Sequence, residues 1–440
     1  MSPTELARYH REIASGMRRN LALFLLVEGV WGLGFAFVSI SAIVPYYLKQ
    51  AGASDQLIGA LPAVWVTAVA AVQLWVAHLT EHLRVKKTVF ALVHYPGSLA
   101  VVVAGFVALH SPRLGSGPTL LLTFLCMAVF GVSLGFATPM WTNLLAKLFP
   151  QGSRGKLFSY AFMIGSAAGI GGAALARWVL SHWPFPSNFA VCFIVSGVIL
   201  SVSVTAFFWL REPELPEATS RVGFARFTRE LWAATGERKG FRSLLAVRCA
   251  ISLANMAGAF YAVAARERFG LGDGSAAVFT MIGLAAQMIS SPLVGFLGDR
   301  HGFRYFAPSG PLLAMAACSV ALLAPSASVF YIVFLLAGMS WPMDFVAMTN
   351  LTIEYCPRMD KTAFLALAGT VVAPFAAIAP LAGGWIAQHA AGEYVPVFRT
   401  ALALNAAAAI LAMLLVREPR ASDPTGGDLQ REVSGSRQLN

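Results

Sequence analysis

Two stretches of the sequence, WTNLLAKLFP at 141–150 and MTNLTIEYCP at 348–357, share Thr-Asn-Leu followed at the same spacing by proline. The two copies lie 207 positions apart. An Arg-Glu-Pro triplet recurs in the same way, at Arg211 and at Arg417, with an offset of 206. Spacing preserved over so long a stretch indicates an internally duplicated chain whose two halves have the same architecture.

The composition excludes an ordinary soluble domain of this length. Only 12% of the residues are charged, against about 25% in soluble proteins. Apolar stretches about 20 residues long recur, and each is long enough to cross a hydrocarbon layer of about 30 Å as a helix. We therefore predict an all-α integral membrane protein with twelve transmembrane helices. They are expected at 21–48, 57–79, 88–110, 118–146, 157–181, 187–210, 243–265, 275–298, 306–325, 328–352, 362–388 and 395–416.

The positions of the positive charges predict how the chain crosses the membrane. The formal net charge is +11, and most of the 32 Lys and Arg lie in the two tails and in the loops on the same side as the tails. This asymmetry follows the positive-inside rule and predicts that both termini are cytoplasmic. We expect a multi-pass protein of the plasma membrane, or of the inner membrane in a bacterium. The basicity is thus explained by orientation, and no nucleic-acid partner is expected.

The longest polar stretch inside the chain separates six spans from six. It predicts an N-terminal half at 1–210 with a cytoplasmic tail at 1–20, a cytoplasmic linker at 211–242, a C-terminal half at 243–416 and a disordered tail at 417–440. Apolar residues at helical spacing leave two interpretations of the linker open, an amphipathic helix on the membrane surface and a solvated connection. Two parallel six-helix halves place a binding site near the membrane midplane between them.

A charged motif, GFLGDRHGFRYF at 295–306, ends the eighth span. Gly295 allows two helices to approach closely, and Gly302 permits the tight turn that follows. Asp299 at the membrane edge requires positive partners, for which Arg300, Arg304 and the positive end of the eleventh helix near Lys361 are candidates. The alternative is a loop whose charges only set the topology.

This motif resembles the Gly-x-x-x-Asp-Arg-x-Gly-x-Arg loop signature of the major facilitator superfamily of secondary transporters. With twelve spans and two duplicated halves, the resemblance covers almost the whole chain. It implies two six-helix halves in a pseudo-twofold arrangement and a cytoplasmic gate closed through this loop. The equivalent loop of the first half keeps an acid at Glu81 but lacks both glycines, so we expect a degenerate latch there.

Three ionisable residues lie inside predicted spans, where each costs about 2.5–3.5 kcal/mol on insertion and is a functional candidate for that reason. They are Glu28, Arg248 and Asp344, all roughly 8–12 Å from the cytoplasmic surface at 1.5 Å per residue. In the resembling fold their helices line the central cavity, so the three are expected to be able to meet. We predict that Glu28 or Asp344 exchanges a proton, and that Arg248 attracts an acid or an anionic substrate. The alternatives are a snorkelling Arg248 and a purely structural pair of carboxylates.

The duplicated asparagines, Asn143 and Asn350, lie late in cavity-lining helices. Their amides are candidates for hydrogen bonds between helices or to a substrate. Trp141 is a candidate for an aromatic lining of the cavity, although aromatic residues in spans also serve as packing or interface anchors.

No Gly-x-x-x-x-Gly-Lys-Ser/Thr loop occurs, which argues against transport driven by ATP. We predict a secondary active transporter, a permease that moves a small-molecule substrate by alternating access with proton coupling. It is expected to act as a monomer among membrane lipids, without enzymatic activity, cofactor or metal. A uniporter without ion coupling and a transporter-like membrane receptor are the alternatives. The substrate and the direction of transport are left open by the sequence.

Overall fold

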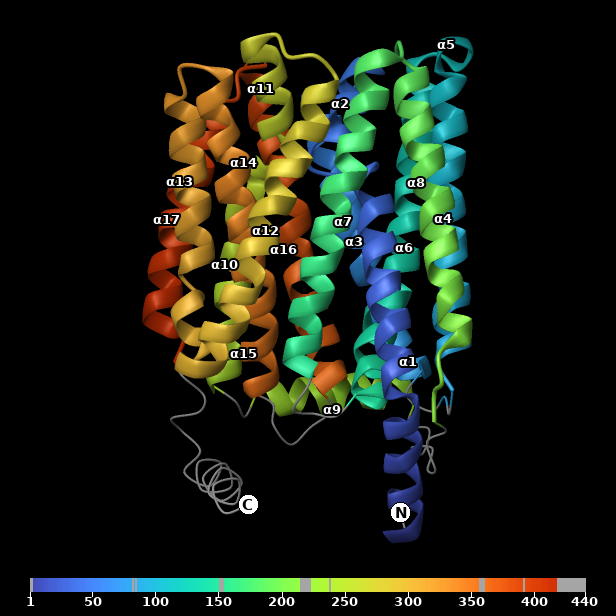
Figure 1. Cartoon of the computed structure of the whole chain (residues 1–440). Coiled ribbons are helices and arrows are strands. Elements are labelled where there is room, and N and C mark those ends of the chain that lie inside the picture. Colours follow the sequence, from blue (N-terminus) through green and yellow to red (C-terminus); the bar gives the residue numbers. More distant parts are fainter. Residues whose placement is uncertain are drawn as a thin grey trace.

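The computed structural model describes residues 3–80, 83, 85–149, 154–213, 223–236, 239–355, 361–390 and 392–417, and the structural statements below concern these residues. Within them, twelve helices are long and apolar enough to cross a membrane. The predicted all-α membrane protein with twelve spans is therefore confirmed. The first half of the chain forms one side of the bundle and the second half forms the other (Figure 1).

The N-terminal half contains six spans and short helices at its loops. Its elements are α1 (Pro3–Ala36), α2 (Ile43–Gln50), α3 (Asp55–Thr80), α4 (Lys87–Leu109), α5 (Ser111–Leu114), α6 (Ser116–Leu148), α7 (Arg154–His182), α8 (Ser187–Thr205) and η2 (Ala206–Trp209).

The C-terminal half follows a connecting helix, α9 (Phe224–Gly236). Its elements are α10 (Lys239–Ala254), η3 (Asn255–Ala259), α11 (Tyr261–Phe269), α12 (Gly274–His301), η4 (Phe303–Phe306), α13 (Ser309–Leu323), α14 (Ala327–Pro342), η5 (Met343–Ala347), α15 (Met348–Glu354), α16 (Lys361–His389) and α17 (Val395–Leu415).

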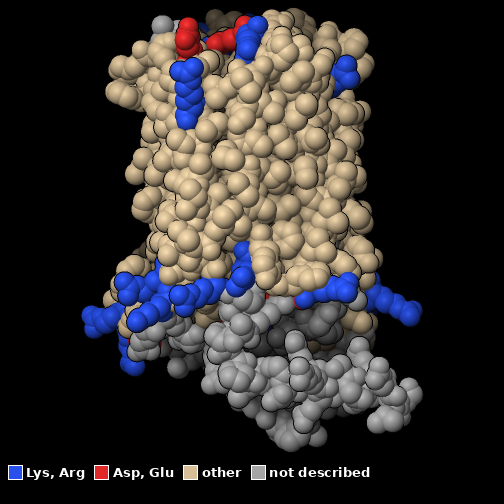
Figure 2. All heavy atoms as spheres, turned by 90° about the vertical axis from the view of Figure 1, so that its left-hand side faces the viewer, with Lys and Arg blue, Asp and Glu red and all other residues tan. Residues whose placement is uncertain are grey.

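The two ends of the bundle differ in charge. We call the end where α1 begins, α9 lies and α17 ends the basic end, and the opposite one, with α2, α5 and α11, the far end (Figure 1). On the face that Figure 2 shows, a band of Lys and Arg side chains marks the basic end, and the surface between the two ends is almost free of charge. The uncharged band is the part of the surface that suits a lipid environment.

Three spans are interrupted. The helix predicted at 21–48 is not continuous, because α1 ends at Ala36 and α2 resumes at Ile43. The seventh span passes through a 3₁₀ segment, η3, and the tenth through a π-helical segment, η5. Pro342 stands directly before η5 and has no N–H to donate to the preceding turn, which loosens the helix there. Such π segments frequently occur at functional sites.

The halves contact each other mainly through two helix pairs, α3 with α16 and α7 with α12. The α3–α16 approach depends on a glycine, because a Cβ at Gly59 would collide with the carbonyl oxygen of Pro380. Small residues at such crossings let helix backbones come close in a membrane.

The connecting helix α9 lies across the basic end and contacts α3, α10 and α16, so it touches both halves. Phe224 stacks on Trp75 of α3 with ring centroids 4.4 Å apart. Leu231 is buried in a cluster with Phe241 and Phe364 of the second half. The apolar face of this linker helix therefore packs on the protein, whereas Trp232 is 60% exposed.

Candidate functional site

In the N-terminal half, Glu28 of α1 faces Trp141 of α6 inside the bundle. The indole Nε1 of Trp141 donates a hydrogen bond of 3.1 Å to the Glu28 carboxylate. Phe24, one turn earlier on α1, packs against the same indole with ring centroids 6.1 Å apart. The predicted candidates Glu28 and Trp141 thus form one unit, in which an aromatic wall orients a half-buried acid.

In the C-terminal half, Asp344 lies in the π segment η5 of the tenth span. Its Oδ2 is 3.5 Å from the amide nitrogen of Asn255, at the start of the 3₁₀ segment η3, which is a long hydrogen bond. Its Oδ1 is buried and has no hydrogen-bond partner. A buried acceptor without a partner costs about 1–3 kcal/mol, more when charged, so this oxygen is held at an energetic cost.

Gly310 of α13 supplies the space that the Asp344 carboxyl group occupies. A Cβ at this position would collide with Oδ1 of Asp344. The carbonyl of Gly310 also accepts a hydrogen bond of 3.0 Å from Ser340, one turn before Asp344 on the tenth span. The glycine therefore fixes the distance between the two helices and the place of the acid.

Arg248 of α10 lies close enough to Asp344 for the two to attract each other electrostatically. Its Nη1 donates a hydrogen bond of 2.8 Å to Thr352, a fully buried residue of α15. Arg248 and Asp344 are thus neighbours in one half, while the hydrogen bond of Glu28 joins it to Trp141 in the other. The meeting of all three residues stays a prediction.

Three residues of this site, Asn255, Gly310 and Thr352, were not among the sequence candidates. Asn255 could have been identified as a candidate from the sequence, because an amide in the middle of a span is an unusual polar group there. Gly310 carried none, since the chain has 39 glycines and only the packing shows which one faces a carboxylate.

Of the two duplicated asparagines, the structure describes the side chain of Asn350 but not that of Asn143. Asn350 donates a hydrogen bond of 2.8 Å to the carbonyl oxygen of Val346, inside η5. A π segment disturbs the regular pairing of backbone groups, so this side chain satisfies a carbonyl of the segment that holds Asp344. Asn143 belongs to α6, but its side chain lies outside the part that the structure describes.

The charged motif after the eighth span forms a helix end with a tight turn. Gly302 has φ of 96° and its N–H binds the carbonyl of Gly298, which ends α12. Arg300 is exposed, and the guanidinium carbon of Arg304 lies 4.8 Å from the centroid of the Tyr305 ring. Asp299 interacts with another group of the protein. The predicted gate function of the motif is not tested by these contacts.

Gly295 and Asp299 line a partly open cavity of about 90 Å³ together with Asn350. Lys361 begins α16, but its side chain lies outside the described residues, as does all of Glu81.

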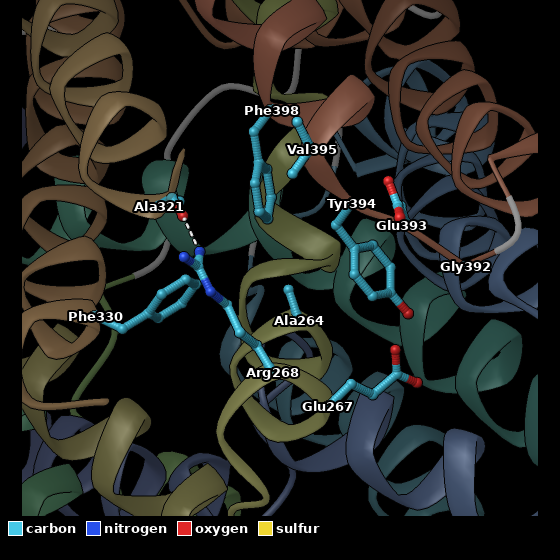
Figure 3. Close-up of a pocket in the computed structure, with 10 residues that line it drawn as sticks. All are labelled: Ala264, Glu267, Arg268, Ala321, Phe330, Gly392, Glu393, Tyr394, Val395 and Phe398. Carbon is cyan, nitrogen blue, oxygen red and sulfur yellow. Dashed lines mark hydrogen bonds between the residues drawn. The ribbon is translucent and has the colours of Figure 1, made fainter. Parts of the chain in front are cut away.

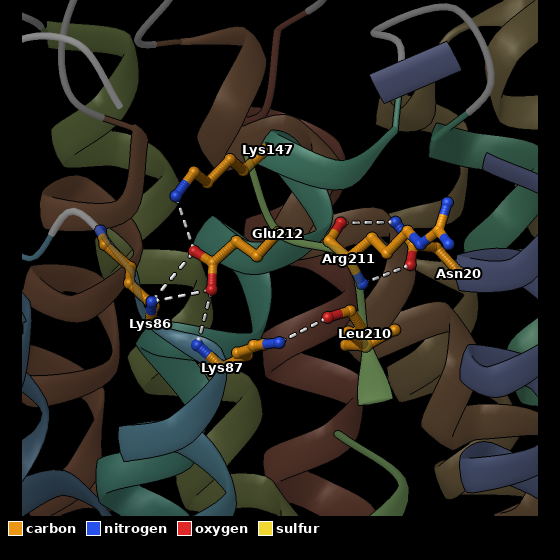
Figure 4. Close-up of polar contacts among 7 residues, drawn as sticks. All are labelled: Asn20, Lys86, Lys87, Lys147, Leu210, Arg211 and Glu212. Atoms are coloured by element: carbon orange, nitrogen blue, oxygen red, sulfur yellow. Dashed lines mark hydrogen bonds and ion pairs between the residues drawn. The ribbon is translucent and has the colours of Figure 1, made fainter. Parts of the chain in front are cut away.

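The corresponding end of the first half carries a buried ion pair. Glu212, in the first Arg-Glu-Pro triplet, accepts backbone N–H hydrogen bonds from Lys86 at 2.9 and 3.0 Å and from Lys87 at 2.8 Å. It also pairs with Lys147 at the end of α6 at 2.7 Å, with side chains 0% and 5% exposed (Figure 4). The carboxylate thus binds the N-terminus of α4, where the helix dipole favours negative charge.

At the far end, polar side chains of the two halves form a network that we call the far-end clamp. Lys49 pairs at 2.8 Å with Asp55 of its own half and at 2.8 Å with Glu267 of the other half. Tyr394 donates a hydrogen bond of 2.8 Å to Asp55 across the interface. Burial lowers the pKa of Lys49, but its contacts with Asp55 and Glu267 raise it more, so the net pKa lies above the ordinary value.

A second centre of the far-end clamp is Asp273, which precedes α12. It accepts hydrogen bonds from Gln50 at 2.7 Å and from Asn188 at 3.0 Å, both in the first half. It is also paired with Arg266 at 2.7 Å within its own half. The halves are therefore joined by ionic and hydrogen-bonded contacts at this end.

A cavity of about 290 Å³ lies beside the far-end clamp, between the ends of α11, α13 and α17 (Figure 3). Arg268 reaches across it and donates a hydrogen bond of 3.0 Å to the carbonyl oxygen of Ala321. Glu267 and Tyr394 belong both to this wall and to the clamp. Neither Glu28 nor Asp344 lines this larger cavity, so we do not assign the two half-buried acids to it.

Twelve membrane-spanning helices in two halves, with a carboxylate inside a span of each half, are typical of a multi-pass membrane protein of the transporter class. The family description Major Facilitator Superfamily matches residues 26–287 and 254–437, and the chain belongs to this superfamily. The predicted two-half fold and the resemblance to the superfamily are thereby confirmed.

Solved structures of transporters share this fold. The D-xylose–proton symporter has a TM-score of 0.68 at 13% identity, covering 91% of this chain and 99% of the other. A mutant of the nucleoside transporter NupG has a TM-score of 0.65 at 10% identity, covering 90% of this chain and 100% of the other. A mutant of the E. coli fucose–proton symporter has a TM-score of 0.61 at 14% identity, covering 91% of this chain and 100% of the other. No curated protein matches the sequence significantly.

Proposed function

We propose that this protein is a secondary active transporter that moves a small solute by alternating access and couples the movement to protons. The observation that carries the proposal is the position of Asp344. It lies in a π segment of the tenth span, beside the 3₁₀ segment of the seventh, and one of its oxygens has no partner. Transporter sites are typically formed by interrupted helices near the midplane between two repeats.

Contacts between the halves at both ends support alternating access. The far-end clamp joins them through Lys49, Asp55 and Glu267. Toward the basic end, Phe162 of α7 meets Trp341 and Phe345 of the tenth span edge-on, with centroids 5.7 and 5.8 Å apart. Each set has to separate when its own end opens, and rocking of one half against the other separates them in turn.

Proton coupling rests on two acids, one in each half. A carboxylate away from water is costly when charged, and taking up a proton removes that cost. The indole that donates to Glu28 and the guanidinium near Asp344 favour the charged forms. For each acid, the cost of a charge away from water favours the protonated form, and the neighbouring group favours the charged form. A group that both binds and releases a proton requires such a balance. Two of the structures with this fold carry the name of proton symporters.

The charge distribution supports an orientation with the basic end in the cytoplasm. Lys and Arg gather at that end (Figure 2), as the positive-inside rule requires of cytoplasmic loops. We infer a plasma-membrane location, or the inner membrane in a bacterium. A monomer suffices for this mechanism, because both halves of the site belong to one chain.

The test is uptake into proteoliposomes with an imposed pH gradient, using labelled sugars, nucleosides, amino acids and organic acids as a first panel. We expect at least one solute to accumulate, with proton movement of matching time course. Glu28→Gln and Asp344→Asn should each reduce the proton-driven accumulation at least tenfold. Glu230→Gln is the matched control, because Glu230 forms an exposed ion pair on α9 and should leave uptake unchanged.

Two outcomes would contradict parts of the proposal. If Glu28→Gln and Asp344→Asn both retain full proton-driven accumulation, the two acids do not couple transport to protons. Saturable solute binding without flux, in wild-type protein of either orientation, would favour the receptor alternative, and flux that ignores the pH gradient would favour the uniporter.

A further inference from the structure

The cavity near the basic end has features of a second binding site. It lies between α7 of the first half and α12, η5 and α15 of the second, so its walls come from both halves. Neither Glu28 nor Asp344 lines it, although Phe345 and Val346 directly follow Asp344 in the chain. It is thus adjacent to the proposed transport site but separate from it.

A hydroxyl group in this cavity lacks a partner. Ser291 is 3% exposed, and its Oγ makes no hydrogen bond to the protein. The neighbouring Ser290 is equally buried, yet its Oγ donates to the carbonyl of Ala286 at 2.7 Å, as serines in helices commonly do. Leaving a buried hydroxyl unpaired is costly, so a ligand that reaches the Ser291 hydroxyl through a small adjustment of the side chains covering it gains a hydrogen bond there.

The other polar groups of the cavity include several acceptors. The amide of Asn350 uses one of its two N–H groups on Val346, which leaves its oxygen as an acceptor and one N–H as a donor. Thr349 adds a hydroxyl, and Asp299, which also interacts within the protein, adds negative charge at the rim. Such a set favours a ligand that donates hydrogen bonds and carries positive charge.

Two aromatic rings supply the apolar part of the wall. Phe162 and Phe345 both line the cavity, and their rings lie edge-on with centroids 5.8 Å apart. Aromatic faces bind apolar groups and attract cations. A volume of about 90 Å³ encloses only a small group, and the rest of a ligand would extend through the open side.

We propose that this cavity is a second site, distinct from the proposed transport site, for a small amphipathic amine. The apolar end of the amine lies against Phe162 and Phe345. Its ammonium group donates to Ser291 and to the acceptor oxygens of Asn350 and Asp299. Because the walls belong to both halves, a bound amine holds the basic end together and stabilises the protein.

The probe for this site is para-fluorophenethylamine, whose binding to the purified full-length protein in detergent is followed by fluorine NMR. Its neutral analogue para-fluorophenylethanol and its acidic analogue para-fluorophenylacetate serve as ligand controls. We expect saturable binding of the amine, about tenfold weaker binding of the alcohol, and no detectable binding of the acid. Unfolding should shift to higher temperature with the amine alone.

The serine pair gives a matched comparison of variants. Ser291→Ala should weaken amine binding about two- to tenfold, the effect of one lost hydrogen bond, whereas Ser290→Ala should leave it unchanged. Phe162→Ala should weaken it about tenfold. Asp299→Asn should reduce the preference for the amine over the alcohol. Size-exclusion chromatography should show that Phe162→Ala and Asp299→Asn remain folded.

Three results would overturn the proposal: no saturable binding, equal effects of the two serine variants, or loss of binding in Asp344→Asn but not in Ser291→Ala. The last would place the amine in the proposed transport site. Since binding is measured without a membrane gradient, a failure of proton-driven uptake would leave this result unaffected, and the two proposals fail separately.

Discussion

The buried pair of Glu212 and Lys147 allows a prediction whose size follows from the structure. Both side chains are almost fully shielded from water. Removing one partner of such a pair leaves an uncompensated charge and costs about 3–5 kcal/mol. The two partners are not equivalent, however, because Glu212 also accepts the backbone N–H groups of Lys86 and Lys87, whereas its pairing with Lys147 is a single contact (Figure 4).

We therefore expect unequal costs from the two single variants. Glu212→Gln removes the buried negative charge that pairs with Lys147 and weakens two helix N-terminal contacts, so it should cost about 3–5 kcal/mol of unfolding free energy. Lys147→Met removes the ion pair with Glu212 while the N-terminus of α4 still holds the carboxylate, so it should cost about 1.5–3 kcal/mol. The double variant should cost at least about 1.5 kcal/mol less than the sum.

The assay is equilibrium unfolding in mixed micelles, followed by near-ultraviolet circular dichroism and analysed as a double-mutant cycle. Arg226→Met is the matched control, because it breaks an ion pair whose side chains are 75% and 59% exposed and should not change stability measurably. If Lys147→Met destabilises the protein as much as Glu212→Gln, or if the two effects simply add, the reasoning about the buried carboxylate is wrong.

Two further predictions concern the buried acid and the far end. Gly310→Ala places a methyl group against the Asp344 carboxyl, so it should lower the unfolding free energy by about 1–3 kcal/mol and reduce proton-driven uptake. Gly258→Ala is the control, because the space around its new Cβ is open, and it should retain uptake. Equal uptake in the two variants would contradict the role of Gly310 in positioning Asp344. Lys49→Met breaks the ion pair to Glu267 and should favour separation of the halves at the far end by about 1.4- to fivefold, measured from the distances between spin labels on one exposed residue of each half. The pKa of Lys49 is raised, so its stabilising contribution to the far-end clamp is complete below the ordinary lysine pKa and is lost only as pH rises through the raised value. The spin-label distance in the wild-type protein should therefore stay constant from about pH 6 to about pH 9. A change of distance within that range would count against the clamp.

The sequence predicted the helical spans well because each is a long apolar stretch, and the cost of exposing backbone groups to lipid leaves helices as the solution for stretches of that length. It did not predict the interruptions. The first span was expected to be continuous, but the chain leaves the helix after Ala36 and resumes it at Ile43. The π segment at Met343–Ala347 is equally apolar apart from Asp344, so hydropathy does not distinguish it from a regular helix.

The candidate site was predicted in part. Glu28, Arg248 and Asp344 were recognisable because an ionisable group inside an apolar span is expensive. The pairings were not, since Trp141, itself a candidate, and the unpredicted Thr352 and Asn255 are joined to them across 89 to 113 positions of the chain. The far-end clamp was missed for the same reason: Lys49 and Glu267 are loop charges in the sequence, and only the approach of the two halves brings them together.

The repeated Thr-Asn-Leu and Arg-Glu-Pro segments, the apolar spans and the asymmetry of positive charge determined by themselves the duplicated twelve-helix membrane architecture, because these properties depend on local composition and order along the chain. The tertiary structure decided what the repeated residues do. Glu212 of the first triplet closes a buried ion pair, Asn350 supports the π segment that holds Asp344, and Gly310 leaves room for that acid. Such roles depend on contacts between helices distant in sequence, and the spacing of residues along one helix does not contain them.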